Sequence, residues 1–378
     1  MPVTSSRLGV PMFDSTKLPK APPQSELYYW ADYVEMLCMI DTDGEYSADR
    51  LASYLGFAGD FLATSPDAQD ADFADVVDLL AEGTAPPVEL YEIIDRGIEP
   101  VGYADDLDPD FAADGELSPF GRDAEVADDR GVWCESIFSL LRSRESLLGD
   151  NYPFAVNVRE MSIKRRDLGD ANSLYIFLLC CSLLRYVPRA TLQELTTHFE
   201  FVSLEALKAL LPSAEVELFG TGRTQLGYSR FTGTALERVA GLAAELRGVL
   251  MAKEGDFNPR DQGDNGLDLV AWIPMNDSTE GVPAFFAQCA CGAKWDGKQY
   301  QASYERWGRW IHLSSPPVKM TFIPHLFRRV GGDWYVGRDV SGVLMDRYRI
   351  ITTLSAATVP AAATVLARMA WNFRRELV

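Results

Sequence analysis

Long apolar runs, cysteine and histidine are scarce in this sequence of 378 residues. The longest apolar run, residues 174–184, is shorter than the roughly 20 residues of a membrane helix, so we expect a buried core helix there. No basic segment followed by an apolar one opens the chain, which predicts a cytoplasmic protein without membrane contact. The six cysteines lie mostly in apolar segments, which indicates reduced thiols.

Several catalytic motifs are also missing. Neither a GxxxxGK[ST] loop nor a GxGxxG loop occurs, which argues against nucleotide hydrolysis. The three histidines, His198, His312 and His325, have no nucleophile partner at a characteristic spacing, which argues against a Ser-His or Cys-His hydrolase. One residue separates Cys289 from Cys291, which is closer than zinc ligands usually are, so a zinc site is disfavoured.

Charge is distributed unevenly along the chain, which carries −20 in total. Residues 1–130 hold 29 acidic and 7 basic residues, whereas residues 290–378 hold 6 acidic and 13 basic residues. The total charge argues against a polyanionic partner, but the basic C-terminal part could attract one. The acidic N-terminal part could fold over the basic part as an autoinhibitory cover.

Composition and apolar spacing divide the chain into five parts. These are a proline-rich extended arm (1–25), an acidic helical module (26–100), an acidic linker (101–130), a helical middle domain (131–228) and a C-terminal domain (229–378). The last part alternates between helix and strand patterns, so the expected fold class is α+β or α/β. Acids of residues 26–130 most simply form a solvated face, and docking of a protein partner is the alternative.

Local patterns predict the individual elements. Three- and four-residue apolar spacing predicts helices over residues 26–37, 73–80, 88–94, 132–141, 174–187, 192–199, 204–211, 235–250 and 359–377. Short apolar or alternating runs predict strands over residues 214–219, 269–272, 284–290, 318–324 and 343–347. Ser47 and Thr191 are expected to be N-caps.

A glycine-rich turn with two carboxylates, Gly263-Asp264-Asn265-Gly266-Leu267-Asp268, runs directly into an apolar strand. A second apolar strand ends in Phe286-Ala287-Gln288-Cys289-Ala290, and Glu237 lies on the helix before the turn. In this order the residues resemble the catalytic domain of Mrr-like nucleases of the PD-(D/E)xK superfamily. The resemblance covers roughly residues 230–360. It implies a restriction-endonuclease-like domain, with a central mixed sheet flanked by helices.

The resemblance further implies a DNA endonuclease that depends on Mg²⁺, with Mn²⁺ as a substitute. A divalent cation offsets charge on the scissile phosphate and lowers the pKa of the attacking water, and Mg²⁺ prefers oxygen ligands. Asp268 matches the metal-binding aspartate, Gln288 matches a position that supplies a side-chain oxygen, and Glu237 would bind the metal or its water. The residues expected to support the turn are Gly263, Asp264 and Gly266.

One position departs from the family. Its catalytic lysine belongs two residues after Gln288, where this chain has Ala290. Lys294, or else Lys298, could return an ammonium group to the site, and Lys294 is the expected catalytic residue. Without such a lysine, the alternative is a non-catalytic scaffold or sensor subunit of a multiprotein complex. Family analogy suggests a role in restriction or anti-phage defence.

Basic residues interleaved with tryptophans predict a DNA-contacting surface. The expected contacts are Lys298, Arg306 and Arg309. The tryptophans between them either pack in the core or stack on bases, and they are Trp295, Trp307, Trp310 and Trp334. Assembly into a homo-oligomer is a further expectation.

Overall fold

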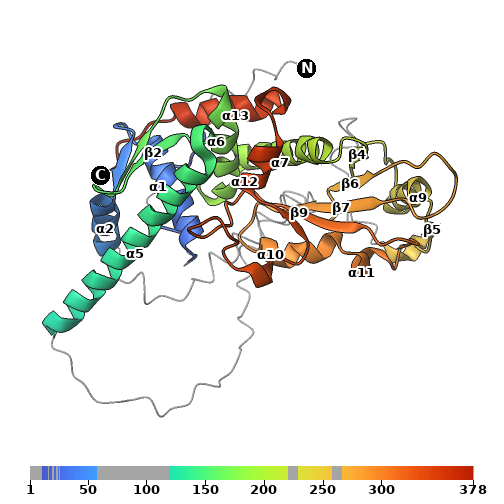
Figure 1. The fold of residues 1–378 in the computed structure, drawn as a ribbon, viewed down its shortest axis with the longest axis horizontal. Helices are drawn as coiled ribbons and strands as arrows, with labels where there is room; N and C mark the ends of the chain where they lie inside the picture. Colours follow the sequence, from blue (N-terminus) through green and yellow to red (C-terminus); the bar gives the residue numbers. More distant parts are fainter. Residues whose placement is uncertain are drawn as a thin grey trace, which may run out of the picture.

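The computed structural model of the chain combines helices with a five-stranded mixed sheet (Figure 1). It describes residues 11–15, 17–18, 21–22, 24, 26–57, 119–219, 229–257 and 266–377, with the backbone alone for 54–57 and 119–130. The class is mixed α+β, which confirms the expected fold class at that level. The helices expected at residues 73–80 and 88–94 lie outside the described residues.

Helix α1 (Leu27–Ile40) is a core helix rather than a surface helix. Every residue except Leu27 is buried, including Asp32 and Glu35. It packs against α5 (Pro119–Leu148), α6 (Asp170–Ser182) and α13 (Ala361–Asn372). The expected solvated acidic face is therefore wrong for this helix, because its carboxylates have buried partners.

A small antiparallel sheet lies beside α1, in the order β1 (Glu45–Ser47), β3 (Ser162–Arg165), β2 (Phe154–Asn157). Helix α2 (Ala48–Phe57) follows β1, and the Ser47 hydroxyl accepts a hydrogen bond from the Arg50 backbone N–H at 3.3 Å. This bond confirms Ser47 as an N-cap, because a side-chain oxygen there satisfies an otherwise unpaired N–H of the first turn.

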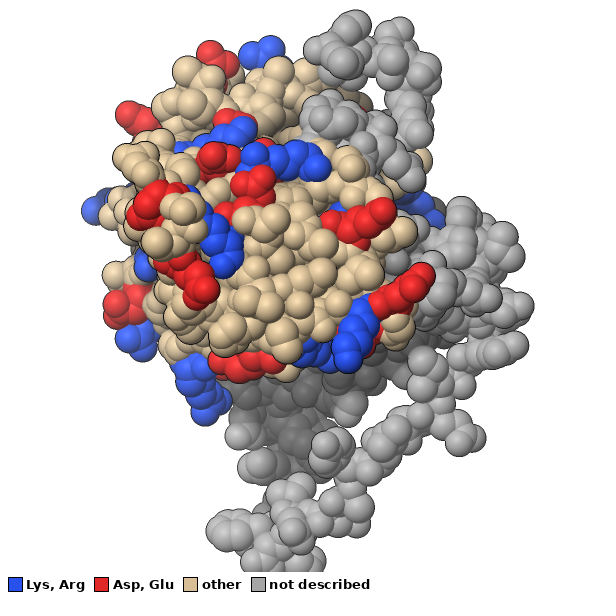
Figure 2. Space-filling model, turned by 90° about the vertical axis from the view of Figure 1, so that its right-hand side faces the viewer, with Lys and Arg blue, Asp and Glu red and all other residues tan. Residues whose placement is uncertain are grey.

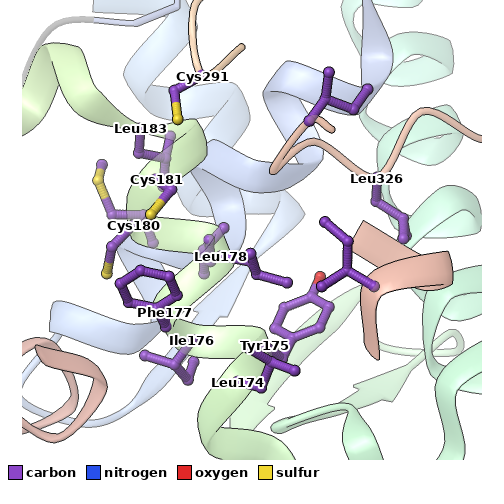
Figure 3. Close-up of a cluster of buried hydrophobic side chains, with 14 of the residues drawn as sticks. Leu174, Tyr175, Ile176, Phe177, Leu178, Cys180, Cys181, Leu183, Cys291 and Leu326 are labelled. Carbon is purple, nitrogen blue, oxygen red and sulfur yellow. The ribbon is translucent and has the colours of Figure 1, made fainter. Parts of the chain in front are cut away.

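Helix α6 confirms the core helix expected from the longest apolar run. Residues Leu174 to Cys181 are all buried, and Figure 3 shows their side chains near Cys291 and Leu326 from the C-terminal part of the chain. One apolar core therefore crosses the predicted boundary between the middle and C-terminal domains. None of the described helices is long and apolar enough to cross a membrane.

The five-stranded sheet has the order β10-β9-β7-β6-β4. Its strands are β4 (Glu215–Leu218), β6 (Leu269–Trp272), β7 (Ala284–Cys289), β9 (Val318–Phe322) and β10 (Val343–Met345). Strands β4, β6 and β7 form an antiparallel meander, whereas β7, β9 and β10 are parallel. All five strands were expected from their apolar patterns.

Helices cover both faces of this sheet (Figure 1). Helix α7 (Arg189–Leu210) contacts β4, β6 and β7 on one face. The other face carries α10 (Trp295–Lys298), the 3₁₀ turn η5 (Gln299–Ala302) and α11 (Tyr304–Trp307), with η5 contacting β7 and β9. Side chains of β7 alternate between the two layers.

The remaining elements extend this architecture. Helix α9 (Ala235–Glu245) leads into β5 (Val249–Leu250), which pairs with β8 (Ile311–His312). Helix α12 (Arg347–Thr353) follows β10 and precedes α13. The helix expected over 235–250 is therefore shorter than predicted.

Three local predictions need correction. The expected linker over 101–130 is helical from Pro119 onward, and proline suits the first turn of a helix because its missing N–H has no partner there in any case. The two helices expected around Thr191 and Leu204 form the single helix α7, whose N-cap is Pro188 rather than Thr191. Strand β4 joins the C-terminal sheet, although it was assigned to the middle domain.

Four fully buried charges join α1 to distant parts of the chain. Arg144 of α5 donates to Asp32 at 2.7 Å and to Glu35 at 2.9 Å. Arg347 of α12 donates to the other Asp32 oxygen at 2.8 Å. Burial alone would raise the pKa of Asp32, but the two guanidinium groups lower it below its ordinary value. Two carboxylates and two guanidinium groups together leave no net charge in the core.

Hydroxyl groups supply further hydrogen bonds to the two carboxylates of this network. Tyr152 and Tyr175 each donate to Glu35 at 2.8 Å, and Ser182 donates to Asp32 at 2.7 Å. These bonds matter because a buried ion pair stabilises a fold only when its remaining oxygens and protons are satisfied.

Replacing Arg347 with methionine should lower the free energy of unfolding by about 3–5 kcal/mol, because Asp32 would lose a buried counter-charge. The control is Arg368→Met, which removes an exposed pair with Asp170 at 3.5 Å and should cost less than about 1 kcal/mol. Urea denaturation of both variants measures the difference. Equal losses would contradict the role assigned to the buried network.

His325 should make stability depend on pH. Burial lowers its pKa from 6.5 to about 4, so between these values the unfolded chain binds a proton that the folded chain does not. Its contribution is constant above pH 6.5, and stability falls as pH drops toward 4, by about 2 kcal/mol at pH 5. His325→Phe should remove this part of the difference in unfolding free energy between pH 7.5 and pH 5. An unchanged pH dependence would contradict the prediction.

Candidate functional site

Asp268 is held by the backbone at the start of β6. Its N–H donates to Ala287 of β7 at 3.1 Å, and its carbonyl accepts from Phe219 at 2.8 Å. The half-buried side chain accepts a hydrogen bond from the Cys289 N–H at 2.6 Å. Two neighbouring strands therefore fix the position of this carboxylate.

Gln288 lies on β7 at the position opposite Asp268, one step beyond the pair Leu269–Ala287. Its side chain is 2% exposed. The amide nitrogen donates to the Cys289 carbonyl at 3.3 Å, while Oε1 has no hydrogen-bond partner among the described residues. A buried oxygen without a partner costs stability, so it marks a position where a ligand would be favourable.

Thr321 continues this polar row on the third strand. It pairs with Gln288 across β7 and β9 and is 2% exposed. Phe286, two residues before Gln288, packs on Trp307 of α11 with ring centroids 5.6 Å apart. Because side chains two positions apart share a face, Gln288 points toward the layer that contains α10, η5 and α11.

The turn before β6 packs directly on η5. Gly266 has φ = +78°, and a Cβ atom at this position would collide with the Gln301 side chain. The packing at position 266 therefore requires glycine, while Gly263 and Asp264 lie outside the described residues. The close packing places η5 beside the strand ends that carry Asp268 and Gln288.

The two candidate lysines occupy different environments. Lys294 precedes α10 and is exposed, whereas Lys298 at the end of α10 is only 8% exposed. Ala290 stands at the position where the resemblance to nucleases would place a lysine; it is buried, and its N–H donates to the Phe322 carbonyl at 2.9 Å. Of the two lysines, Lys298 lies in the buried layer next to η5.

Glu237 has a structural task in its own helix. Its carboxylate accepts from the Thr234 N–H at 2.7 Å, and the Thr234 hydroxyl accepts from the Glu237 N–H at 3.2 Å. This capping box stabilises the start of α9, and its hydrogen bonds lower the pKa of the exposed Glu237 side chain. One of its two carboxylate oxygens is therefore committed to the cap.

Glu200 of α7 is a buried carboxylate that sequence reasoning missed, and it lies on the face of the sheet opposite to the one that Gln288 points to. It is 7% exposed, and its charge acts on the same thiol as that of Asp268. Burial raises the pKa of Cys289, and the carboxylates of Asp268 and Glu200 raise it further. The sequence held one signal of this burial: Glu200 directly follows Phe199, which belongs to the apolar face of its helix.

The predicted DNA contacts are only partly at the surface. Arg309 is exposed and stacks on Trp310 with its guanidinium carbon 4.2 Å from the ring centroid, while Arg306 is half-buried. The tryptophans Trp295, Trp307 and Trp310 are buried, and Trp334 is half-buried. Core packing is therefore the correct reading for the three buried rings, which leaves them unavailable for bases.

The far end of the sheet has a different surface. Exposed apolar residues there include Val249, Leu250, Met251 and Met275. Figure 2 shows a broad uncharged area on this side, with basic and acidic residues at its margin. This view lacks the continuous basic surface that attracts a nucleic-acid backbone.

The donor set suits a hard cation with few protein ligands. Within the described part of the chain, no three His, Cys, Asp or Glu side chains converge on one point that could hold a metal ion. Mg²⁺ usually takes one or two carboxylates and completes its shell with water and phosphate. Asp268 and the unpartnered oxygen of Gln288 fit that pattern.

Replacing Gly266 with alanine should lower the free energy of unfolding by about 1–3 kcal/mol, because the residue has positive φ and its Cβ would meet Gln301. Gly297 of α10 is the matched control, since a Cβ there meets no atom within 4 Å. Gly297→Ala should be neutral or slightly stabilising. Thermal or urea denaturation compares them, and equal stability of the two variants would contradict the close packing of turn and η5.

Comparison of the chain with protein-family models, with curated proteins and with solved structures gave no match.

Proposed function

We propose that the protein is a Mg²⁺-dependent DNA endonuclease that hydrolyses phosphodiester bonds. The observation that carries the proposal is the placement of Asp268 and Gln288 on neighbouring strands, with the buried Gln288 Oε1 lacking a partner among the described residues. The mixed sheet between helical layers is compatible with the restriction-endonuclease-like domain that the sequence resembles. A function in restriction or anti-phage defence rests on that resemblance alone.

Asp268 and Gln288 would hold the cation through side-chain oxygens. When bound, Mg²⁺ offsets charge on the scissile phosphate and lowers the pKa of a water molecule; Mn²⁺ accepts the same ligands. The hydrogen bond from the Cys289 N–H keeps the Asp268 carboxylate oriented at the strand end. The collision of any Gly266 side chain with Gln301 indicates how tightly the turn and η5 enclose this position.

Basic residues of α10 and its surroundings would complete the site. The burial of Lys298 supports it as the cation beside the reacting phosphate, and the exposed Lys294 is better suited to a backbone phosphate outside. Arg309 is exposed enough to contact DNA. The net positive charge of residues 290–378 favours such a partner.

A non-catalytic scaffold or sensor subunit is the second candidate. The observation in its favour is Ala290, which is buried where the family has its lysine. In that case the chain would keep the fold and bind DNA or a protein partner without cutting.

Asp268→Ala should reduce Mg²⁺-dependent cleavage of plasmid or phage DNA by at least about 100-fold, because loss of a metal ligand removes several kcal/mol of transition-state stabilisation. Gel assays with Mg²⁺ or Mn²⁺ measure the rate, and calorimetric titration measures metal binding. The matched control is Asp333→Ala, which removes an exposed acid paired with Arg329 and should leave both unchanged.

Two results would decide against the nuclease. Equal cleavage by wild type and Asp268→Ala would show that the activity comes from elsewhere. If the wild-type protein binds DNA but does not cleave it with either ion, the result would favour the non-catalytic scaffold or sensor subunit.

A further inference from the structure

Tyr300 of η5 is unusual among the aromatic residues of this protein. Its side chain is 56% exposed, and it is the only aromatic among the exposed large hydrophobic residues of the described segments. Single exposed apolar residues are common on protein surfaces and need no explanation in themselves. The surroundings of Tyr300, rather than its exposure, are what carry an argument.

The backbone on both sides of Tyr300 is fixed. Gln299 is 3% exposed, donates to the Asp339 carbonyl at 2.6 Å and accepts from the Ser341 N–H at 3.0 Å. The Tyr300 carbonyl accepts from the Ser303 N–H at 3.0 Å, and the Gln301 carbonyl accepts from the Trp307 indole at 2.8 Å. The backbone that carries the tyrosine ring is therefore already ordered. Binding would cost only the conformational entropy of the Tyr300 side chain itself.

This segment borders the proposed metal site. Gln301, the next residue, packs against Gly266, which lies two residues before Asp268. The same turn contacts β7 and β9, where Gln288 and Thr321 lie. A nucleic-acid strand with its phosphate at Asp268 and Gln288 would therefore pass the η5 surface.

We propose that Tyr300 is a base-stacking residue at the entrance of this site, so that the site takes a strand with an unpaired base rather than an intact duplex. The proposal rests on the proposed nuclease function and adds the form of its substrate. An exposed aromatic ring offers every base a stacking face, whereas bases inside a duplex already stack on one another. The exposed Lys294, at the start of the same α10–η5 segment, supplies a charge for the backbone.

The test is binding of the full chain to a fluorescently labelled 12-nucleotide DNA strand and to the same strand in a duplex, by anisotropy with Ca²⁺ in place of Mg²⁺, so that the site holds a cation that prefers oxygen ligands, with a gel to verify that the DNA is uncut. Tyr300→Ala should weaken single-strand binding about 5- to 150-fold, the range of one stacked base. Tyr300→Phe should bind like wild type, and duplex binding should change little in either variant. Val330→Ala, at another exposed apolar residue, is the control.

A tryptophan at position 300 provides a readout that a structural role would not move. In Tyr300→Trp, the indole emission should be quenched by the single strand and unaffected by the duplex. The proposal is overturned if Tyr300→Ala binds the single strand like wild type, or if it weakens both forms of DNA equally. If Asp268→Ala loses cleavage while Tyr300→Ala binds DNA normally, only the stacking role of Tyr300 is contradicted. If Asp268→Ala cleaves DNA as wild type does, the proposed nuclease function is contradicted instead.

Discussion

The buried charges of Asp32, Glu35, Arg144 and Arg347 are the constraint on which the rest of the fold depends. They join the first described helix to α5 and to α12, across sequence separations of 112 and 315 residues. Removing any one partner would leave a charge in the apolar interior, so the four residues hold the helices as a set. The same requirement makes the N-terminal helix part of the core that supports the C-terminal sheet, and rules α1 out as a detachable cover.

The sequence predicted local elements well and their partners poorly. The strands β6 and β7 and the helix α6 were predictable because the lengths of their apolar runs, together with the turn residues that flank the two short runs, separate strand from helix. The burial of Asp32 and Glu35 was not readable, because a carboxylate on a helix is ordinarily solvated and its partners lay far along the chain. Likewise, the short strand β4 shows its alternation locally, but nothing local says which sheet it joins.

In the candidate site, too, local features were predictable from the sequence and contacts between distant segments were not. Asp268 and Gln288 could be paired from sequence, because a turn and two successive strands bring neighbouring ends together. The cap formed by Thr234 and Glu237 is also a local motif, since Thr followed three residues later by Glu is the pattern of a capping box. The burial of Glu200 and Lys298 could not be predicted from the sequence, because it depends on how α7 and α10 pack against opposite faces of the sheet. The specific fold family and the chemistry stay predictions.

The placement of α1 also has a consequence for how the protein is made. Its carboxylates leave the ribosome about 315 residues before Arg347 does, which at about 5–20 residues per second is a delay of roughly 15–60 s. During that interval, the part of the core that contains Arg347 is not yet available to pack against α1. The backbone N–H of Arg375, which donates to the Ile40 carbonyl at 2.8 Å, arrives later still. The growing chain therefore cannot finish its core from the N-terminus onward, because the buried carboxylates of α1 need guanidinium groups from both α5 and α12.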